Sequence, residues 1–191
     1  MATSSLVGWR KRPGFEYQQE WFAFGRRHYA EMPEATCNYM YNLRRFADAA
    51  QASTVLEIGV GPEAVSALAF AYSAAVKKVV SIEIDPSLPG EVFREAIRDR
   101  VEWDLVYGDS CETVITDAVE LLYIDGAKDN TLTDFERYYG NVKQGGFIVI
   151  DDFPCYMGVR QARTELETRG VHFVDLPYDG TMNGHLIWRK S

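Results

Sequence analysis

The chain has 191 residues, which suits a single domain with a substantial core over residues 1–191. Its formal net charge of -8 argues against non-specific binding to nucleic acid. No apolar run approaches the roughly 20 residues of a membrane span. Residues 1–14 lack the apolar core of a signal peptide, so we expect a cytoplasmic protein with no membrane partner. The three cysteines are far apart and lack metal-site spacing, which favours free thiols.

Residues 1–51 are predicted to form a polar arm followed by two amphipathic helices. The first helix should run from about Glu16 to Glu31. The second should follow Pro33 and carry Leu43 and Phe46 on its apolar face. Two helices ahead of a sheet need a surface to pack on. We therefore expect them to cover the open edge of the site or to form the interface of a homodimer.

From residue 52 to residue 191, buried strands and helices alternate and form the predicted core. Strands are expected at 54–59, 79–84, 102–107, 121–124 and 147–150. Helices are expected at 63–75, 91–98, 111–118, from Leu132 to Val142, and around Val159–Leu166. The segments 171–176 and 185–189 should form a final antiparallel hairpin. This order predicts an α/β domain with a doubly wound, mostly parallel seven-stranded sheet and helices on both faces.

Acidic residues follow two neighbouring strands of this sheet. Asp125 ends the strand 121–124, and Asp151 and Asp152 end the strand 147–150. A strand–helix–strand unit makes the two strands parallel, so their carboxyl ends share one edge of the sheet. Lys128 lies on the same rim. Three carboxylates brought together repel unless a cation or protons lie among them.

A nucleoside-containing cofactor is indicated by the residues that end the first three strands. Gly59 and Gly61 precede a helix, where the backbone can approach an anionic ligand. Glu83 is placed to accept hydrogen bonds from ribose hydroxyls. Asp109 and Ser110 suit either contact with adenine or capping of the next helix. Taken singly, each feature also fits a tight turn or a solvated strand end.

These segments together resemble the motif series of class I S-adenosylmethionine-dependent methyltransferases. The segments are Val55-Leu-Glu-Ile-Gly-Val-Gly61, Ser81-Ile-Glu-Ile-Asp85, Gly108-Asp-Ser110, Tyr123-Ile-Asp-Gly126 and Gly145-Gly-Phe-Ile-Val-Ile-Asp-Asp152. The resemblance covers Thr54 to the C-terminus and implies a Rossmann-like fold and S-adenosylmethionine as cofactor. Glu57, two residues before Gly59, looks methyltransferase-like and separates this cofactor from NAD, the other interpretation of the glycine loop.

The segment Ile124-Asp-Gly-Ala-Lys-Asp-Asn130 is similar to cation-dependent catechol and caffeoyl-CoA O-methyltransferases. The similarity implies that Asp125, Asp151 and Asp152 ligate a divalent cation and that Lys128 is the catalytic base. Hard oxygen ligands favour Mg²⁺. Asp125 would also lie against the cofactor.

Three departures from that family matter. Asp152 stands where Asn is usual, and Glu63 stands where a helix-opening Gly is usual. The Tyr-Ile-Asp-Gly motif and the Asp-Asp pair look more like those of a bacterial group of methyltransferases that act on sugars and antibiotics. That group often has His in place of Lys128.

The expected function is methyl transfer to a hydroxyl group of a small molecule, assisted by a divalent cation and Lys128. One alternative is a cation-independent methyltransferase in which Asp152 or Lys128 only positions the acceptor. Another is a protein that binds S-adenosylmethionine without catalysis. The histidines at 28, 172 and 185 are expected to be structural. Trp21, Tyr39 and Tyr156 suit the wall of an acceptor pocket or packing in the core or at an interface.

Overall fold

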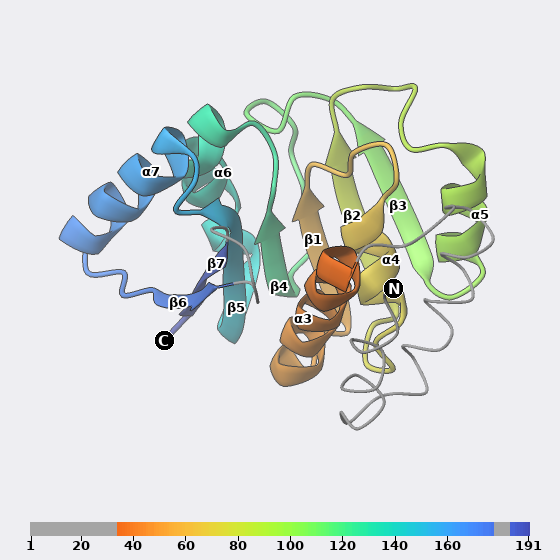
Figure 1. The fold of residues 1–191 in the computed structure, drawn as a ribbon, viewed down its shortest axis with the longest axis horizontal. Coiled ribbons are helices and arrows are strands. Elements are labelled where there is room, and N and C mark those ends of the chain that lie inside the picture. The colour runs from red at the N-terminus through yellow and green to blue at the C-terminus, as the bar shows by residue number, and fades with distance from the viewer. Residues whose placement is uncertain (1–33, 178–183) are drawn as a thin grey trace, which may run out of the picture.

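The computed structural model describes residues 34–177 and 184–191, which form a three-layer α/β arrangement (Figure 1). The strands are β1 (Thr54–Ile58), β2 (Lys78–Glu83), β3 (Glu102–Tyr107), β4 (Val119–Ile124), β5 (Val142–Phe153), β6 (Val174–Pro177) and β7 (Gly184–Arg189). The α-helices are α3 (Glu34–Ala50), α4 (Val65–Ala71), α5 (Glu91–Arg98), α6 (Thr131–Tyr138) and α7 (Met157–Thr168). Two short 3-10 helices, η1 (Lys128–Asn130) and η2 (Tyr139–Asn141), flank α6.

The seven strands form one sheet in the order β3-β2-β1-β4-β5-β7-β6. The pairs from β3 to β5 are parallel, and β7 is antiparallel to both β5 and β6. The predicted doubly wound sheet with a C-terminal hairpin is therefore confirmed. Because β1 lies between β2 and β4, the chain reverses its winding direction there, which is where such sheets bind ligands.

Each central strand contributes to two cores because alternate side chains point to opposite faces. On one face, Leu121 and Tyr123 of β4 pack with α3, α4 and α5. On the other, Leu122 and Ile124 pack with α6 and α7. The near-continuous apolar run of β4 follows from this burial on both faces.

Two predicted helices differ from the structure in extent. The helix predicted at 63–75 begins only at Val65 and ends at Ala71, and Ala64 ahead of it adopts a left-handed conformation with φ 45°. The helix predicted from Leu132 continues only to Tyr138 and then tightens into η2, so Val142 already belongs to β5.

The prediction of a helix at 111–118 is wrong. This segment forms a turn followed by an irregular stretch. Side chains of α6 and η2 donate hydrogen bonds to the backbone carbonyl groups that would accept hydrogen bonds within a helix. Arg137 donates to the carbonyls of Glu112 and Thr113, and Asn141 donates to those of Ile115 and Asp117. The β-branched run at 113–116 also disfavours a helix.

The second N-terminal helix is confirmed as α3, whereas the one predicted at about Glu16–Glu31 lies outside the described residues. Helix α3 packs on the same face as α4 through Met40, Leu43 and Ala47. Among the residues with described positions, no helix has both the length and the hydropathy to span a bilayer.

Candidate active site

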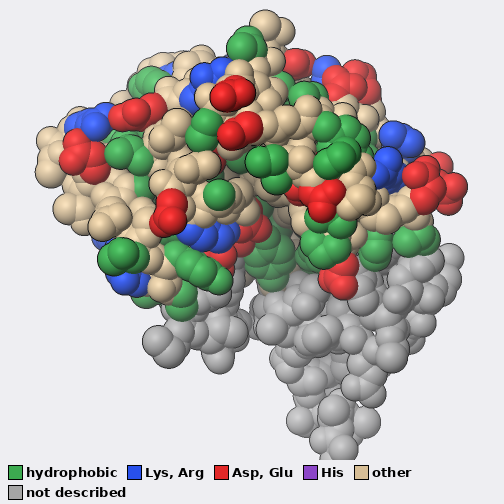
Figure 2. Space-filling view, turned by 90° about the horizontal axis from the view of Figure 1, so that it is seen from above, with side chains coloured by type: hydrophobic (Ala, Val, Ile, Leu, Met, Phe, Trp, Pro, Cys, Tyr) green, Lys and Arg blue, Asp and Glu red, His purple; other side chains and the backbone are tan. Residues whose placement is uncertain are grey.

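A cavity of about 240 Å³ opens at the carboxyl ends of the central strands. Its lining residues are Ile58, Gly59, Ile82, Glu83, Ile84, Gly108, Asp109, Ser110, Asp125, Gly126, Ala127 and Asn130. Figure 2 looks down on this edge of the molecule and shows a hollow near its middle. The structure thus brings together Gly59, Glu83, Asp109, Ser110 and Asp125, which the sequence pattern predicted for one cofactor.

Gly59 allows the loop after β1 to lie directly against the loop after β4. Its φ is 84°, and a Cβ atom there would come within 2.7 Å of the Asp125 carbonyl oxygen. Any side chain would therefore push Asp125 out of place. Gly61 also has a positive φ, 69°, but no neighbour within 4 Å of a Cβ, and it does not line the cavity.

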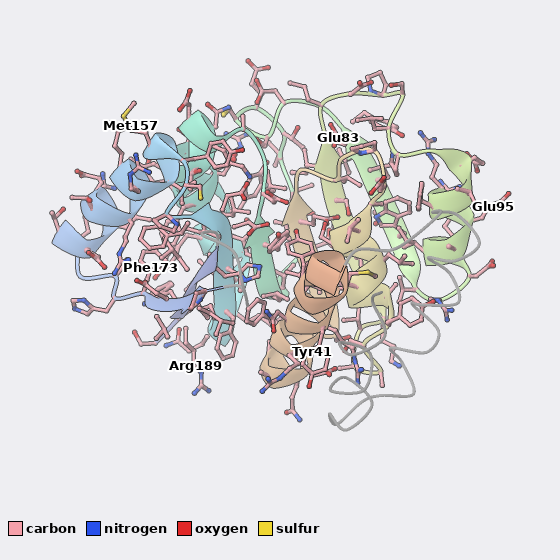
Figure 3. All side chains as sticks on the ribbon, in the orientation of Figure 1. Tyr41, Glu83, Glu95, Met157, Phe173 and Arg189 are labelled. Atoms are coloured by element: carbon pink, nitrogen blue, oxygen red, sulfur yellow. The ribbon has the colours of Figure 1, made fainter. Side chains whose placement is uncertain are left out.

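Glu83 organises this glycine loop from the end of β2. One carboxylate oxygen accepts the backbone N–H groups of Val60 at 3.0 Å and Gly61 at 2.9 Å. The other accepts the N–H of Asp85 at 3.0 Å. Figure 3 shows Glu83 at the upper end of its strand, and the side chain is only 7% exposed. A carboxylate has about four acceptor positions, so one remains for a ligand.

Asp109 and Ser110 close the cavity on the β3 side. The Asp109 carboxylate accepts the N–H of Cys111 at 2.8 Å, and Tyr138 of α6 donates to the Ser110 carbonyl at 2.7 Å. Asp109 therefore caps a turn, where the sequence suggested a helix cap, and lines the cavity as well.

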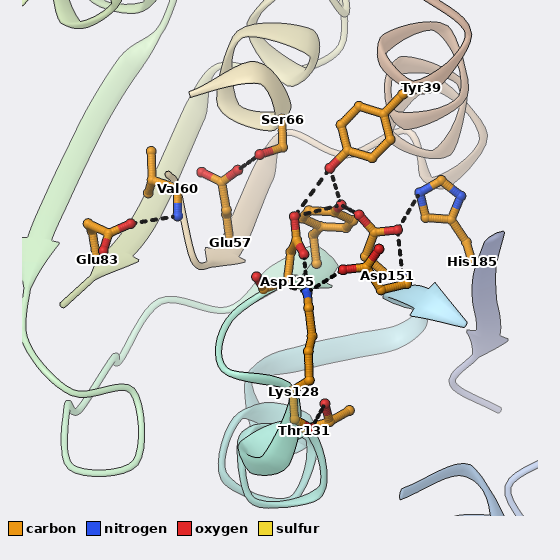
Figure 4. Close-up of polar contacts among 12 residues, drawn as sticks. Tyr39, Glu57, Val60, Ser66, Glu83, Asp125, Lys128, Thr131, Asp151 and His185 are labelled. Carbon is orange, nitrogen blue, oxygen red and sulfur yellow. Dashed lines mark hydrogen bonds and ion pairs between the residues drawn. The ribbon is translucent and has the colours of Figure 1, made fainter. Parts of the chain in front are cut away.

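Glu57 lies behind the cavity and does not line it. The carboxylate is fully buried on β1 and accepts a hydrogen bond from Ser66 of α4 (Figure 4). It accepts another from Ser81 of β2. The Trp103 indole N–H of β3 donates to the same Ser81 hydroxyl at 2.8 Å. Burial raises the pKa of Glu57 to about 7. In this structure Glu57 joins three strands and a helix and makes no approach to the cofactor cavity.

Glu57→Gln should flatten the dependence of stability on pH. The folded-state pKa of about 7 exceeds the ordinary 4.5, so the folded protein binds more protons between these values. The free energy of unfolding should therefore fall as pH rises through this window, by up to about 3 kcal/mol from this group. A neutral amide removes that loss. Urea unfolding at pH 5 and pH 8 checks this, with the exposed Glu95→Gln as control. Equal pH slopes for wild type and variant would contradict it.

Asp125, Asp151 and Asp152 do converge, because β4 and β5 pair in parallel with Ile124 opposite Ile150. The Lys128 ammonium group lies among them (Figure 4). It forms an ion pair with Asp125 Oδ1 and lies 2.9 Å from Asp152 Oδ2. Asp125 thus belongs both to the cavity lining and to this acidic cluster.

The backbone of Lys128 is fixed from two sides. Thr131, in the first turn of α6, donates its hydroxyl to the Lys128 carbonyl at 2.8 Å. Gly158 of α7 packs on the same carbonyl so closely that a Cβ atom would collide with it. The ammonium group therefore projects from a rigid base into the acidic cluster.

Asp151 is turned away from Lys128. One of its oxygens accepts the Tyr123 hydroxyl at 2.6 Å, and the other accepts the N–H of Asp152 at 2.7 Å. His185 Nε2 lies 3.6 Å from that second oxygen. Among residues 34–177 and 184–191, no three His, Cys, Asp or Glu side chains are arranged to hold a metal ion. The donor types suit a hard cation, but Lys128 stands between Asp125 and Asp152 and Asp151 faces Tyr123.

The acidic cluster carries an excess of negative charge. Burial lowers the pKa of Lys128, but the charges of Asp125 and Asp152 outweigh it, so the pKa lies above its ordinary value. Burial and the charge of Asp151 raise the pKa of Asp125. Burial lowers the pKa of His185 to about 4, so this side chain is neutral at pH 7. The cluster consequently holds three carboxyl groups and a single ammonium group, which contacts two of them.

Two neighbours of this cluster were not predicted as site residues. His185 was expected to be structural and remote, but β7 pairs with β5 and places Leu186 opposite Ile150, next to Asp151. Tyr39 reaches the cluster from α3. The hairpin prediction could have located His185, because a strand returning beside β5 must pass Asp151. Tyr39 was considered for the wall of an acceptor pocket or for packing, but nothing in the sequence placed its hydroxyl group beside Asp125.

Residues 99–190, just under half of the chain, match the profile of the family described as Macrocin-O-methyltransferase (TylF). No curated protein matches the chain. Three solved structures share the fold at low identity. They are the O-methyltransferase from Bacillus cereus with S-adenosylhomocysteine (17% identity, TM-score 0.68, 100% of this chain and 98% of that one), methyltransferase PaMTH1 from Podospora anserina with S-adenosylhomocysteine (16%, 0.68, 98% and 94%), and the O-methyltransferase TomG from Streptomyces achromogenes with S-adenosylmethionine (17%, 0.56, 91% and 99%).

The same sheet and helices thus recur in cofactor-bound methyltransferases over nearly the whole chain. The family match covers β4, β5 and the terminal hairpin, where the acidic cluster lies. The chain therefore has the fold of S-adenosylmethionine-dependent methyltransferases, and its C-terminal half resembles the macrocin O-methyltransferases.

Proposed function

We propose that this protein transfers the methyl group of S-adenosylmethionine to a hydroxyl group of a small molecule. The observation that carries the proposal is the position of Asp125, which lines the strand-end cavity and also belongs to the acidic cluster with Lys128. A cofactor in the cavity would therefore present its methyl group beside the side chains that can handle a hydroxyl proton. The family match and the methyltransferases that share the fold support the same reaction.

In this proposal the nucleoside lies across Glu83, Asp109 and Ser110. Ile84, which is 70% exposed at the rim, offers an apolar surface for the adenine ring. Gly59 lets the methionine portion approach the backbone. Gly61 contributes only through the N–H that Glu83 holds, and Glu57 contributes through the strands beneath the cavity.

Glu83→Ala should weaken the binding of S-adenosylhomocysteine by about 10–150-fold, or about 1.5–3 kcal/mol. The substitution removes a charged acceptor for the ribose and also releases the N–H groups of Val60 and Gly61. Calorimetry measures the affinity directly. Asp85→Ala is the matched control, since Asp85 is an exposed acid two residues further on whose carboxylate accepts hydrogen bonds from Ser87 and does not line the cavity. Unchanged affinity in Glu83→Ala would rule out this cofactor position.

Methyl transfer requires the acceptor oxygen to lose its proton and attack the methyl carbon as the carbon–sulfur bond breaks. The products are a methyl ether and S-adenosylhomocysteine. Lys128 is the nearest candidate to take that proton, but its raised pKa keeps it protonated at pH 7. Lys128 can act as a base only when another positive charge neutralises Asp125 and Asp152.

A divalent cation such as Mg²⁺ is the finer part of the proposal. It would be held by Asp125, Asp151 and Asp152, and when bound it would lower the pKa of the acceptor hydroxyl. The excess negative charge of the cluster supports it. Cation binding would require Lys128 to leave its position between Asp125 and Asp152. Asp151 would bind the cation through the lone pairs that its hydrogen bond from Tyr123 leaves free.

A cation-independent methyltransferase is favoured by one specific observation, the ion pairs that already place the Lys128 ammonium between two carboxylates. Methyl transfer to phenols, sugars and amines, measured with and without a chelator, separates the possibilities. Loss of activity on chelation supports the cation, and full activity supports Lys128 as the internal positive charge. Binding of S-adenosylmethionine with no product from any acceptor would indicate a protein without catalysis.

We further propose a cytoplasmic homodimer. The free thiols of Cys111 and Cys155 suit a reducing compartment. Shared walls between two subunits would complete an acceptor pocket that a chain of this length leaves open. Sedimentation at micromolar concentration should show a dimer, and deletion of residues 1–31 should convert it to a monomer or make it insoluble. A full-length monomer would contradict the proposal.

A further inference from the structure

Two tyrosine hydroxyl groups lie between the carboxylates of Asp125 and Asp151 (Figure 4). Tyr123 on β4 donates to Asp151 Oδ2 at 2.6 Å, and its oxygen lies 3.4 Å from Asp125 Oδ2. Tyr39 on α3 hydrogen-bonds to the Tyr123 hydroxyl and lies 3.3 Å from the same Asp125 oxygen. The contacts form a continuous path from Asp125 through both phenols to Asp151.

The two rings are held by packing that does not involve their hydroxyl groups. Tyr123 is fully buried and meets Phe70 of α4 edge to face, with ring centres 5.6 Å apart. The Tyr39 ring stacks on His185 at 5.9 Å and 20°. Phe46, also on α3, packs edge to face against the His185 ring, with ring centres 5.0 Å apart. The hydroxyl groups are therefore fixed points to which the carboxylates adjust.

We propose that Tyr39 and Tyr123 are positioning residues, whose paired hydroxyl groups hold Asp125 and Asp151 side by side for the proposed transfer site. Parallel pairing of β4 and β5 brings the two carboxylates together, and like charges would otherwise turn apart. Hydrogen bonds to charged groups are among the stronger ones in proteins. Since the phenols face Asp125 Oδ2, its other oxygen is left to face Lys128.

This inference rests on the proposed function only in giving Asp125 and Asp151 a role in methyl transfer. It adds helix α3 to the site, because Tyr39 is the side chain through which α3 reaches Asp125. If the tyrosines served only to fill the core, phenylalanine would replace them without effect on the carboxylates. That difference defines the experiment.

The variants are Tyr39→Phe, Tyr123→Phe and the double substitution, with Tyr41→Phe as the matched control. Tyr41 lies two positions along α3, is 7% exposed and has the Arg45 guanidinium over its ring. Crystal structures with S-adenosylhomocysteine should show Asp151 turned from its place in Tyr123→Phe, and both carboxylates displaced in the double variant. The affinity for S-adenosylhomocysteine should be unchanged in Tyr123→Phe, because Asp151 does not line the cofactor cavity, and this separates the result from a failure of the cofactor proposal.

A Mn²⁺ titration, followed by calorimetry, then tests positioning apart from packing. Each Phe variant should bind Mn²⁺ about 10–100-fold more weakly than wild type, and Tyr41→Phe should match wild type. Carboxylates that keep their places in all three variants overturn the proposal. If wild type itself takes up no Mn²⁺, the cation part of the proposed function fails, and the crystal structures alone decide: displaced carboxylates support the phenol pair and unmoved ones overturn it.

Discussion

Replacing Lys128 with methionine should lower the turnover of methyl transfer by about 100-fold or more. Methionine keeps most of the length and apolar character of the side chain but removes the ammonium group that contacts Asp125 and Asp152. The affinity for S-adenosylhomocysteine should change little, because Lys128 does not line the cofactor cavity. Steady-state kinetics and calorimetry together give the two quantities. The control is Lys143→Met, which removes an ammonium group paired with Glu120 outside the acidic cluster.

The same substitution distinguishes the two roles that Lys128 can have toward a divalent cation. The ammonium group occupies the space between Asp125 and Asp152, so removing it should tighten Mn²⁺ binding if those carboxylates form the cation site. Turnover that falls while Mn²⁺ binds more tightly identifies Lys128 as a base or positioning group beside a cation. Turnover that falls with no Mn²⁺ binding in either protein makes Lys128 itself the positive charge of the site. Normal turnover in Lys128→Met would place the chemistry elsewhere on the rim.

The fold could be predicted from the sequence where apolar runs are bounded by acids or glycines. Helix α5 and strand β3 have the predicted bounds, because a charged helix and a strand that is followed directly by Gly108 leave little ambiguity. The segment 111–118 could not be predicted in the same way. Its conformation depends on Arg137 and Asn141, which follow more than twenty residues later in the chain and bind its carbonyl groups.

The candidate site could be predicted at the level of which residues meet, but not of how they face. Parallel pairing was sufficient to bring Asp125 near Asp151 and Asp152. The orientation of each carboxylate is set by partners that lie far apart in sequence: Tyr123 and His185 for Asp151, and Lys128 for Asp152. Glu57 shows the same limit. Its position two residues before Gly59 suggested a role at the cofactor, but Ser66 and Ser81 hold its side chain beneath the cavity.

Asp152 allows a sharp test of whether the site needs an oxygen ligand or a charge. Its φ is 62°, a left-handed conformation that glycine and asparagine adopt at lower cost than alanine, so Asp152→Gly and Asp152→Asn are the substitutions that strain the backbone least. Glycine removes every side-chain oxygen, whereas asparagine keeps one and loses only the charge. Neither should alter the binding of S-adenosylhomocysteine, because Asp152 does not line the cofactor cavity.

If Asp152 is a cation ligand, Asp152→Gly should lose about 100-fold or more of the turnover, and Asp152→Asn should retain activity within about 10-fold of wild type. If its charge matters through Lys128, at 2.9 Å, both variants should lose activity to a similar degree. Steady-state kinetics at saturating cofactor, with and without added Mg²⁺, measures this. Asp129→Asn controls for the loss of one negative charge, since Asp129 is exposed and adjacent to Lys128. Full activity in Asp152→Gly would remove Asp152 from the site and leave Asp125 with Lys128 as the pair that handles the acceptor.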